Sequence, residues 1–408
     1  MTYGETAASR LDAIARASAS AEGVTRLPWT EHHRAALDQI ASWMTDAGLE
    51  PAQDAAGTLV GRSPNPEGKP VLMIGSHQDS VPSGGAFDGI MGIALGCLVA
   101  GALKDRLPAL PFALEVLAFA DEEGVRFPTA LIGPRALAGT LKAEALDMTD
   151  RDDVAMRDAM RAFGVAVDKI GAVQRARRDV VAYLEAHIEQ GPVLEAEDLP
   201  VAAVSAICGI SRFDMRITGE TGHAGTVPMD GRRDALVAAS RIIAAVSDAA
   251  AQVPDLRATV GTLALKPGAV NAIPADVRFP LEIRAPQDTL REAFEAEAMA
   301  LARDICFDAN CDLSAVQTYA QPAAVCDPGL TRALEGAIGK ADLVPLTIPS
   351  GATHDASAMA DLCPIAMLFV RCRGGISHRP DEFASAADMD VAVRVMADAF
   401  LAYADKLG

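Results

Sequence analysis

The sequence predicts an α/β protein in which a mixed-sheet domain is interrupted by a smaller, ferredoxin-like α+β domain. Three observations lead to this prediction. Strand and helix patterns alternate over the first half of the chain, the pattern changes near residue 210, and the alternation resumes after Cys326. Alternating strands and helices form a parallel or mixed sheet that is covered on both faces. The chain has 408 residues, enough for two or three domains.

Hydrophobic patterning defines the elements of the first half. Apolar residues at helical spacing predict a helix from Trp29 to Gly48, and a nearly continuous apolar run predicts a buried helix from Ile90 to Leu103. Short apolar runs predict buried strands at Val71–Gly75, Ala113–Ala120 and Val180–Ile188.

The middle of the chain has the order strand, helix, strand, strand, helix, strand, which is typical of a ferredoxin-like sandwich. The expected elements are Arg212–Gly219, Arg232–Val253, Leu256–Leu265, Asp276–Arg284, Thr289–Cys306 and Asp312–Thr318. We therefore expect residues 1–209 and 324–408 to form the two parts of the larger domain, and residues 210–323 to form the inserted one.

Composition excludes several classes of protein. The formal net charge of -19 argues against sequence-independent binding to nucleic acid or to anionic membranes. The N-terminus lacks the pattern of a secretory signal, and no apolar stretch reaches the ~18 residues of a membrane span. We expect a cytoplasmic protein. Its seven cysteines, an odd number without a CxxC pair, are expected to be buried and reduced.

Strand ends and loops of the larger domain carry imidazole and carboxylate side chains that together form a ligand set for two divalent metal ions. The expected ligands are His77, Asp88, Glu123, His187 and His378. Two histidines on one metal, Glu and His on the other and a shared Asp would give a bridged pair. Such ligands suit Zn, Mn, Co or Ni. Taken singly, these residues also have structural interpretations, such as a helix N-cap for Asp88 or a solvated acidic turn for Glu122 and Glu123.

Two further acids have predicted roles beside the ligands. Glu122 is the candidate general base, because a base must lie next to the activated water without occupying a coordination position. Asp79 follows His77 by two residues, so we expect it to accept a hydrogen bond from the second ring nitrogen of that histidine. A two-metal site activates water and polarises a carbonyl, so the sequence predicts a metal-dependent amide hydrolase.

Six segments carry a resemblance to a known family. The sequence resembles the M20 metallohydrolases, specifically the hydantoinase/carbamoylase branch of N-carbamoyl-L-amino acid hydrolases, β-ureidopropionases and allantoate amidohydrolases. The resemblance covers almost the whole chain. It rests on the segments GSHQDSVPSGGAFDG, DEEGVRF, HIEQGPVLE, GHAGTVPMDGRRDA, HDA and GGISHRPDE.

The resemblance implies the same division of the metal ligands and the same base. One metal would belong to His77 and His187 and the other to Glu123 and His378, with Asp88 shared. It also implies that the larger domain is a di-metal catalytic domain and that the inserted domain is a lid through which two chains form a homodimer.

The resemblance further implies residues that contact the substrate. His223 would stabilise the oxyanion, often from the partner subunit, while Asn271 and Arg284 would bind the substrate carboxylate. Gln190 would contact the carbamoyl group. Thr353 and His354 would lie beside the substrate, although many relatives have Gly at position 353. Other departures from the family pattern, which leave the ligands and the base intact, are Thr58, Gln78, Glu282 and the added charges Arg371 and Arg373.

The predicted function is hydrolysis of the ureido C–N bond of an N-carbamoyl-amino acid or an allantoate-like carboxylate. A metal-bridging hydroxide would attack the carbonyl, with Glu122 as base. The alternatives are an N-acyl-amino acid amidohydrolase or dipeptidase, and a non-catalytic binding protein on the same scaffold, which would usually have lost a ligand or the base. The expected partner is a small anionic ureido or N-acyl amino acid.

Overall fold

The computed structural model describes residues 1–65 and 68–407, which divide into two compact units. The large unit contains Met1–Ser205, Cys326–Ile348 and the residues from Ala352 onward. The small unit contains Ala206–Val325 together with the short segment Pro349–Gly351.

A mixed sheet forms the centre of the large unit, with the strand order β1-β2-β4-β3-β5-β14-β6-β12 and β13 paired to β6. Strand β3 is parallel to both β4 and β5, and β14 is parallel to β5, whereas β1, β2 and β6 pair in antiparallel fashion. The strands are β1 Glu50–Gln53, β2 Leu59–Arg62, β3 Val71–His77, β4 Ala113–Phe119, β5 Val180–Ile188, β6 Val201–Ile207, β12 Ala324–Val325, β13 Thr347–Ser350 and β14 Ile365–Val370.

Helices cover this sheet, and α3 is the most deeply buried of those that contact it. Helix α3 is apolar on all sides because it packs against β3, β4 and β5 on one side and against α1, α2 and α11 on others. The helices are α1 Tyr3–Ile14, α2 Glu31–Asp46, α3 Ile90–Leu103, α4 Ile132–Ala138, α5 Met156–Ala162, α6 Val193–Ala196, α9 Pro328–Lys340, α10 Asp355–Met359 and α11 Ala386–Leu407. Short 3-10 helices occur at Leu107–Ala109, Ala143–Asp147, Val167–Ala172, Arg177–Asp179 and Arg373–Gly375.

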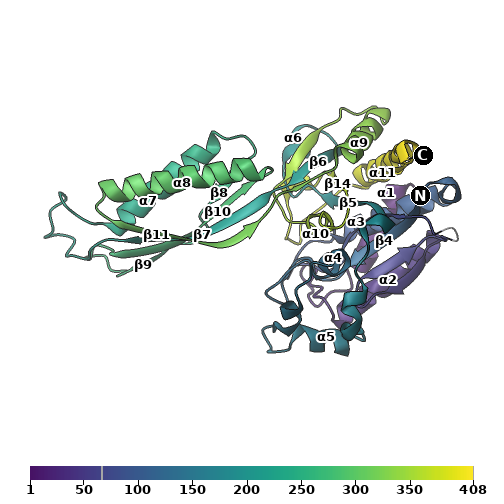
Figure 1. The fold of residues 1–408 in the computed structure, drawn as a ribbon, viewed down its shortest axis with the longest axis horizontal. Coiled ribbons are helices and arrows are strands. Elements are labelled where there is room, and N and C mark those ends of the chain that lie inside the picture. Colours follow the sequence, from purple (N-terminus) through teal and green to yellow (C-terminus); the bar gives the residue numbers. More distant parts are fainter. Residues whose placement is uncertain (66–67, 408) are drawn as a thin grey trace. The chain divides into compact units, whose positions relative to one another are not determined.

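The second helix shows how sequence sets an element's bounds. The side chain of Thr30 accepts a hydrogen bond from the backbone N–H of His33, so α2 begins at Glu31 rather than at Trp29. Its buried face includes Ile40 and Met44, as the apolar spacing predicts. Helices α1 and α11 contact each other, so both ends of the described chain lie on the same side of the large unit (Figure 1).

The small unit has the predicted ferredoxin-like order, and Figure 1 shows α7 and α8 lying along one face of its sheet. The strand order is β11-β7-β10-β8, with β9 also paired to β10, and all pairs are antiparallel. The elements are β7 Gly209–Thr218, α7 Ala235–Ala251, β8 Arg257–Thr259, β9 Ala264–Lys266, β10 Asp276–Ala285, α8 Asp288–Asp308 and β11 Asp312–Gln321.

One predicted strand is wrong, and several elements were not predicted. Residues 256–265 do not form a single strand but contribute to β8 and β9, which pair with different parts of β10. Pro280, which has no N–H to donate, lies in β10 between these two pairings, and Gly261 lies in the intervening loop. Helix α1 and strands β1, β2 and β6 were also missed, because their apolar runs are short or weakly periodic.

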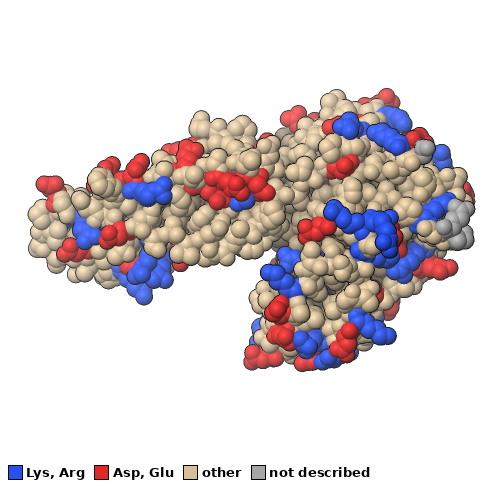
Figure 2. All heavy atoms as spheres, viewed as in Figure 1, with Lys and Arg blue, Asp and Glu red and all other residues tan. Residues whose placement is uncertain are grey.

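The surface and the cysteines agree with the composition. Figure 2 shows acidic and basic side chains interspersed on the face in view. Within residues 1–65 and 68–407, no helix combines the length and apolar character that a membrane crossing requires. All seven cysteines are buried and free, as expected.

Candidate active site

Three parallel strands place candidate catalytic and metal-binding side chains at one edge of the large sheet. His77 is the last residue of β3, Glu122 lies three residues beyond the end of β4, and His187 lies next to the last position of β5. Because β3 pairs in parallel with both β4 and β5, the carboxyl ends of all three strands meet. This edge is where open α/β sheets usually place their sites.

Asp88 reaches the same edge on the turn that precedes α3. The next residue, Gly89, has a φ of 66°, and a Cβ at that position would lie 2.4 Å from the His77 ring. Only glycine therefore allows the turn to approach His77 this closely. The side chain of Asp88 is 6% exposed.

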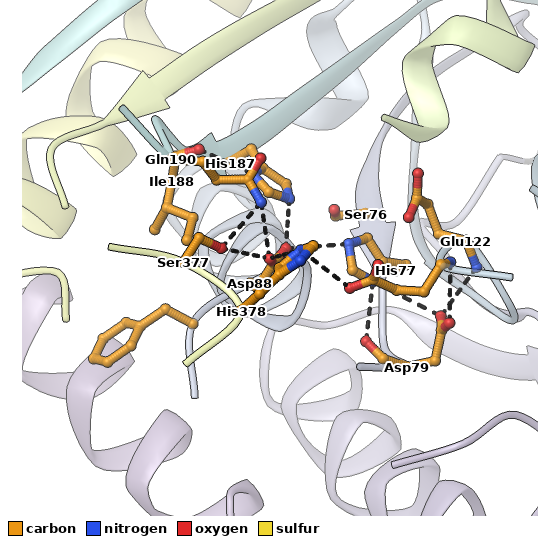
Figure 3. Close-up of polar contacts among 12 residues, drawn as sticks. Ser76, His77, Asp79, Asp88, Glu122, His187, Ile188, Gln190, Ser377 and His378 are labelled. Carbon is orange, nitrogen blue, oxygen red and sulfur yellow. Dashed lines mark hydrogen bonds and ion pairs between the residues drawn. The ribbon is translucent and has the colours of Figure 1, made fainter. Parts of the chain in front are cut away.

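The two oxygens of Asp88 face different histidines (Figure 3). Oδ1 lies 2.9 Å from Nε2 of His187 and 3.4 Å from Nε2 of His77. Oδ2 lies 3.2 Å from Nε2 of His378. Asp88 thus lies between the imidazoles of His77 and His187 on one side and that of His378 on the other, as a bridging carboxylate would.

The potential ligand atoms form compact groups. In one group His77 and His187 surround Asp88, and in another Glu123 and His378 do; within each group the ligand atoms all lie within 4.8 Å of one another. Two further groups of this kind are His77 with Glu122 and Glu123, and Glu185 with His187 and His354.

The donor chemistry fits divalent metal ions. Imidazole nitrogens and carboxylate oxygens without thiolates suit Zn, Mn, Co or Ni. Oε1 of Glu123 is buried and has no hydrogen-bond partner among the described residues. Since a buried carboxylate oxygen is normally hydrogen-bonded or bound to a metal, this atom, which lies 3.7 Å from Nε2 of His378, supports a cation beside Glu123.

The second nitrogens of the two buried histidines are oriented by backbone carbonyls. Nδ1 of His77 lies 3.0 Å from the carbonyl oxygen of Asp79, and Nδ1 of His187 lies 2.9 Å from that of Ile188. The sequence-based prediction for Asp79 differs here, because its carboxylate lies 3.7 Å from the His77 ring and it is the backbone that makes the contact.

The carboxylate of Asp79 instead holds the acidic turn after β4. Oδ1 accepts from the backbone N–H of Glu122 at 3.1 Å, and Oδ2 accepts from that of Glu123 at 3.2 Å. The backbone next to Asp79 is also fixed. The buried Arg26 donates a hydrogen bond from Nε to the carbonyl oxygen of Gln78, the residue before Asp79, at 2.6 Å.

Burial perturbs the acids of this turn. Burial raises the pKa of Glu122 well above its usual range, although the charge of His77 opposes that rise. Burial also raises the pKa of Glu123, to about 7. For Asp88 the opposite holds, since burial is outweighed by the charge and hydrogen bond of His187, and its pKa lies well below the usual value. Neighbouring carboxyl groups with opposed pKa shifts are typical of sites that divide acid–base and charge-binding roles.

Gln190, His354 and Thr353 lie in the large unit. Gln190 Nε2 donates to Oδ2 of Asp88 at 2.9 Å and to Oγ of Ser377 at 3.0 Å. His354 is buried, packs edge-on against the His187 ring at 4.5 Å, and has a pKa well below its usual value because of burial. Thr353 is half-buried.

His223, Asn271 and Arg284 lie in the small unit. The segments that carry His223 and Asn271 are adjacent. His223 forms a backbone bridge with Ala272, and the backbone carbonyl oxygen of Asn271 accepts a hydrogen bond from the N–H of Ala224 at 2.9 Å. Both His223 and Asn271 are exposed. Arg284, in β10, is half-buried and donates from Nε to Glu282 at 2.7 Å.

Comparison with known proteins shows the family of this chain. Residues 73–402 match the model of peptidase family M20/M25/M40. The chain belongs to this family. Its relatives include the N-carbamoyl-L-amino acid amidohydrolase of Geobacillus stearothermophilus, 38% identical over 376 residues that cover 92% of each chain. The probable allantoate deiminase of Oryza sativa subsp. japonica is 38% identical over 386 residues, covering 86% of this chain and 78% of the rice protein.

Solved structures agree with this membership. The crystal structure of a hydantoinase/carbamoylase family amidase from Burkholderia multivorans matches with a TM-score of 0.90 and 32% identity, over 98% of each chain. The matched segment of the M20 family includes every predicted metal ligand of this chain, from His77 to His378.

Two buried acids near the site, Glu185 and Glu382, and the half-buried Ser377 were missed by sequence reasoning. Glu185 is fully buried in β5 and accepts from Oγ of Ser76 and from the backbone N–H of Ala356, both at 2.8 Å. It lies two residues before His187 on an otherwise apolar strand, a spacing that places both side chains on one face and was the available signal. Ser377 and Glu382 flank His378 and contact the Asp88 turn.

The structure also explains one of the departures from the M20 pattern. Arg371 forms ion pairs with Asp388 at 2.9 Å and with Asp198 at 2.9 Å, so its charge is balanced within the large unit. The guanidinium of Arg373 lies over the ring of Phe383, 4.7 Å from its centroid. Both added charges therefore have partners within the large unit.

Proposed function

We propose that this M20 member is a metal-dependent amidohydrolase that cleaves the ureido C–N bond of an N-carbamoyl-amino acid or an allantoate-like carboxylate. The observation that carries the proposal is the position of Asp88, whose two oxygens face separate groups of ligands. The names of the relatives, N-carbamoyl-L-amino acid amidohydrolase and allantoate deiminase, support the choice of bond.

The proposed division of ligands follows the two groups around Asp88. His77 and His187 would hold one ion, Glu123 and His378 the other, and Asp88 both. Bound divalent ions of the Zn, Mn, Co or Ni class polarise a carbonyl and lower the pKa of water.

Glu122 carries the proton transfers in this mechanism. It lies on the turn held by Asp79, and burial raises its pKa well above the usual range, which favours the uptake of a proton by this carboxylate. Its Oε atoms would take the proton of the attacking water and pass it to the departing nitrogen. The fixed backbone of the turn keeps the carboxylate beside the ligands while it changes protonation state.

The remaining candidate residues have proposed roles in binding the substrate. We propose that the imidazole of His223 donates a hydrogen bond to the developing oxyanion and that Gln190 contacts the carbamoyl group. Asn271 and Arg284 would bind the carboxylate, for which a planar guanidinium is suited. Glu282 orients Arg284 for this task, and Thr353 and His354 would line the pocket near the ureido carbonyl.

We also propose that the active form is a homodimer, in which His223 serves the site of the partner subunit. Light scattering at assay concentration tests the assembly. A dimer that loses activity on dilution to monomers is the expected result, and an active monomer would exclude a role for His223 across subunits.

A substrate panel tests the proposed function. Mn-loaded and Zn-loaded protein would be given N-carbamoyl-L-amino acids, N-carbamoyl-β-alanine, allantoate and the matching N-acetyl compounds, with ammonia and free amine both measured. Ammonia release from ureido compounds is expected. Release of free amine without ammonia, from the acetyl compounds alone, would favour an acylase or dipeptidase. This alternative is retained because the matched family is a peptidase family.

A further inference from the structure

Glu382 contacts the backbone of the turn that carries Asp88, although it lies 294 positions after Asp88 in the sequence. It is 4% exposed, and Oε1 accepts hydrogen bonds from the backbone N–H groups of both Phe87 and Asp88, each at 2.9 Å. Two successive amides therefore converge on one buried carboxylate oxygen. A buried carboxylate with such partners fixes the backbone that donates to it.

The same carboxylate also holds the loop of His378. Oε2 of Glu382 accepts from Oγ of Ser377 at 2.9 Å, and Ser377 also lies 2.9 Å from Oδ2 of Asp88. A hydroxyl has one proton, so Ser377 donates to one of these carboxylates at a time while it accepts from Nε2 of Gln190 at 3.0 Å. Glu382 thus joins the segments that carry Asp88 and His378.

The neighbouring turn is shaped to admit this carboxylate. A Cβ on Gly85 would lie 2.1 Å from Oε1 of Glu382, so any larger residue would displace it. His378 has a φ of 59°, in the left-handed region that non-glycine residues seldom adopt, so contacts around its loop must hold that conformation. The links through Ser377 and Glu382 are such contacts.

We propose that Glu382 is a positioning residue that couples the placement of Asp88 to that of His378 and so sets the affinity of the metal site that these two share with Glu123. The proposal rests on the two-metal site of the proposed function but not on the identity of the substrate. Groups that orient ligands change metal affinity or activity by about 10- to 100-fold when they are removed.

Metal titration of chelator-stripped protein tests this inference without substrate. Glu382→Ala is expected to bind the weaker of two Mn²⁺ or Zn²⁺ ions about 10- to 100-fold less tightly than the wild type. Glu382→Asp keeps the charge but withdraws the oxygens by one methylene, so it should show a similar loss. Glu382→Gln can still present one oxygen to both amides, so its loss should be smaller than that of Glu382→Ala.

A matched control separates positioning from general destabilisation. Asp327 also accepts two backbone N–H bonds through one oxygen, from Gly329 at 2.8 Å and Leu330 at 2.9 Å, but it caps α9. Asp327→Ala should lower the melting temperature while leaving metal affinity unchanged. Wild-type affinity for both ions in folded Glu382→Asp, or an equal loss in Asp327→Ala, would overturn the proposal. Failure of every ureido substrate alongside the expected affinity losses would refute the substrate assignment alone.

Discussion

His77 and His187 of the large unit are held very differently from His223 and Asn271 of the small unit. In the large unit, His77 and His187 are each 2% exposed and are oriented at both ring nitrogens, by Asp88 on one side and by a backbone carbonyl on the other. In the small unit, His223 and Asn271 are exposed to solvent. The first set is organised before anything binds, whereas an exposed imidazole becomes an effective donor only where water is excluded.

Because of this difference, the residues of each unit should affect different measured quantities. Changes to the buried set should alter metal content and stability, since those side chains bind each other in the folded chain. Changes to the exposed set should leave both intact and alter kcat or KM.

Metal removal should have the largest effect and should act through the large unit. Stripping with a chelator is expected to abolish hydrolysis and lower the melting temperature, because Asp88 and Glu123 lose the cations that balance them. An ion present at 100 times its Kd contributes about 2.7 kcal/mol to stability. Activity and calorimetry before and after Mn²⁺ or Zn²⁺ is restored provide the check. Full activity in protein with only background metal would contradict the two-metal assignment.

His223→Ala should lower kcat by about 10²- to 10³-fold, the usual cost of one oxyanion donor. Metal content and melting temperature should stay at wild-type values because the side chain is exposed. His32→Ala, a surface change on α2, serves as the control and should have no effect on kcat. A loss of metal in His223→Ala would break the proposed distinction between the units.

Arg284→Ala should raise KM by roughly 10- to 100-fold, since hydrogen bonds to charged groups contribute about 1.5–3 kcal/mol. The matched control is Arg278→Ala, on the same face of β10, where the guanidinium is 3.9 Å from Asp276. Steady-state kinetics on the best ureido substrate would compare the two. Equal KM changes would show that the strand's general charge, rather than Arg284, binds the carboxylate.

The smallest effect concerns His33 and the pH dependence of stability. Burial, with the charges of Arg26 and Arg34, lowers the pKa of His33 well below its ordinary 6.5, and Nδ1 accepts from the N–H of Trp29 at 2.8 Å. A depressed folded pKa stabilises the fold above pH 6.5, and this contribution is lost as pH falls from there toward the folded pKa, by at most about 1.4 kcal/mol for each pH unit. His33→Asn keeps an acceptor without a titrating ring.

Unfolding midpoints of wild type and His33→Asn, measured in the same metal state between pH 7 and 5, provide the test. The wild type should lose stability faster as pH falls, because only its unfolded state gains the proton. Parallel curves would mean that His33 titrates with an ordinary pKa.

Much of the fold, and the grouping of the candidate ligands, could be predicted because strand patterning and motif position carry the same information. His77 and His187 lie at the ends of apolar strands, Glu122 follows such a strand by three residues, and parallel pairing brings these ends together. The split of residues 256–265 into two strands was not foreseen, since it shows only in their pairing with two different parts of β10 in the folded chain. The role of Asp79 differed for a similar reason, because the contact that orients His77 comes from a backbone carbonyl.

The residues that fix the backbone of the candidate ligands were harder to predict from the sequence. Glu382 acts on Asp88 across most of the chain's length, through backbone amides that have no sequence signature. Asp79 likewise accepts hydrogen bonds from two successive amides, those of Glu122 and Glu123, with one on each carboxylate oxygen. Both acidic turns of the site are therefore fixed by a carboxylate from a distant segment, a pattern visible only in the folded chain.

The most direct test of the account compares the adjacent acids of one turn, Glu122→Gln and Glu123→Gln, by kcat and by metal content on the same preparations. The account predicts that Glu122→Gln lowers kcat by about 10²- to 10⁴-fold while keeping both ions, the behaviour of a lost general base. Glu123→Gln should lose one ion. Near-normal kcat in Glu122→Gln, or loss of an ion from it, would contradict the assignment of Glu122 as base and Glu123 as ligand.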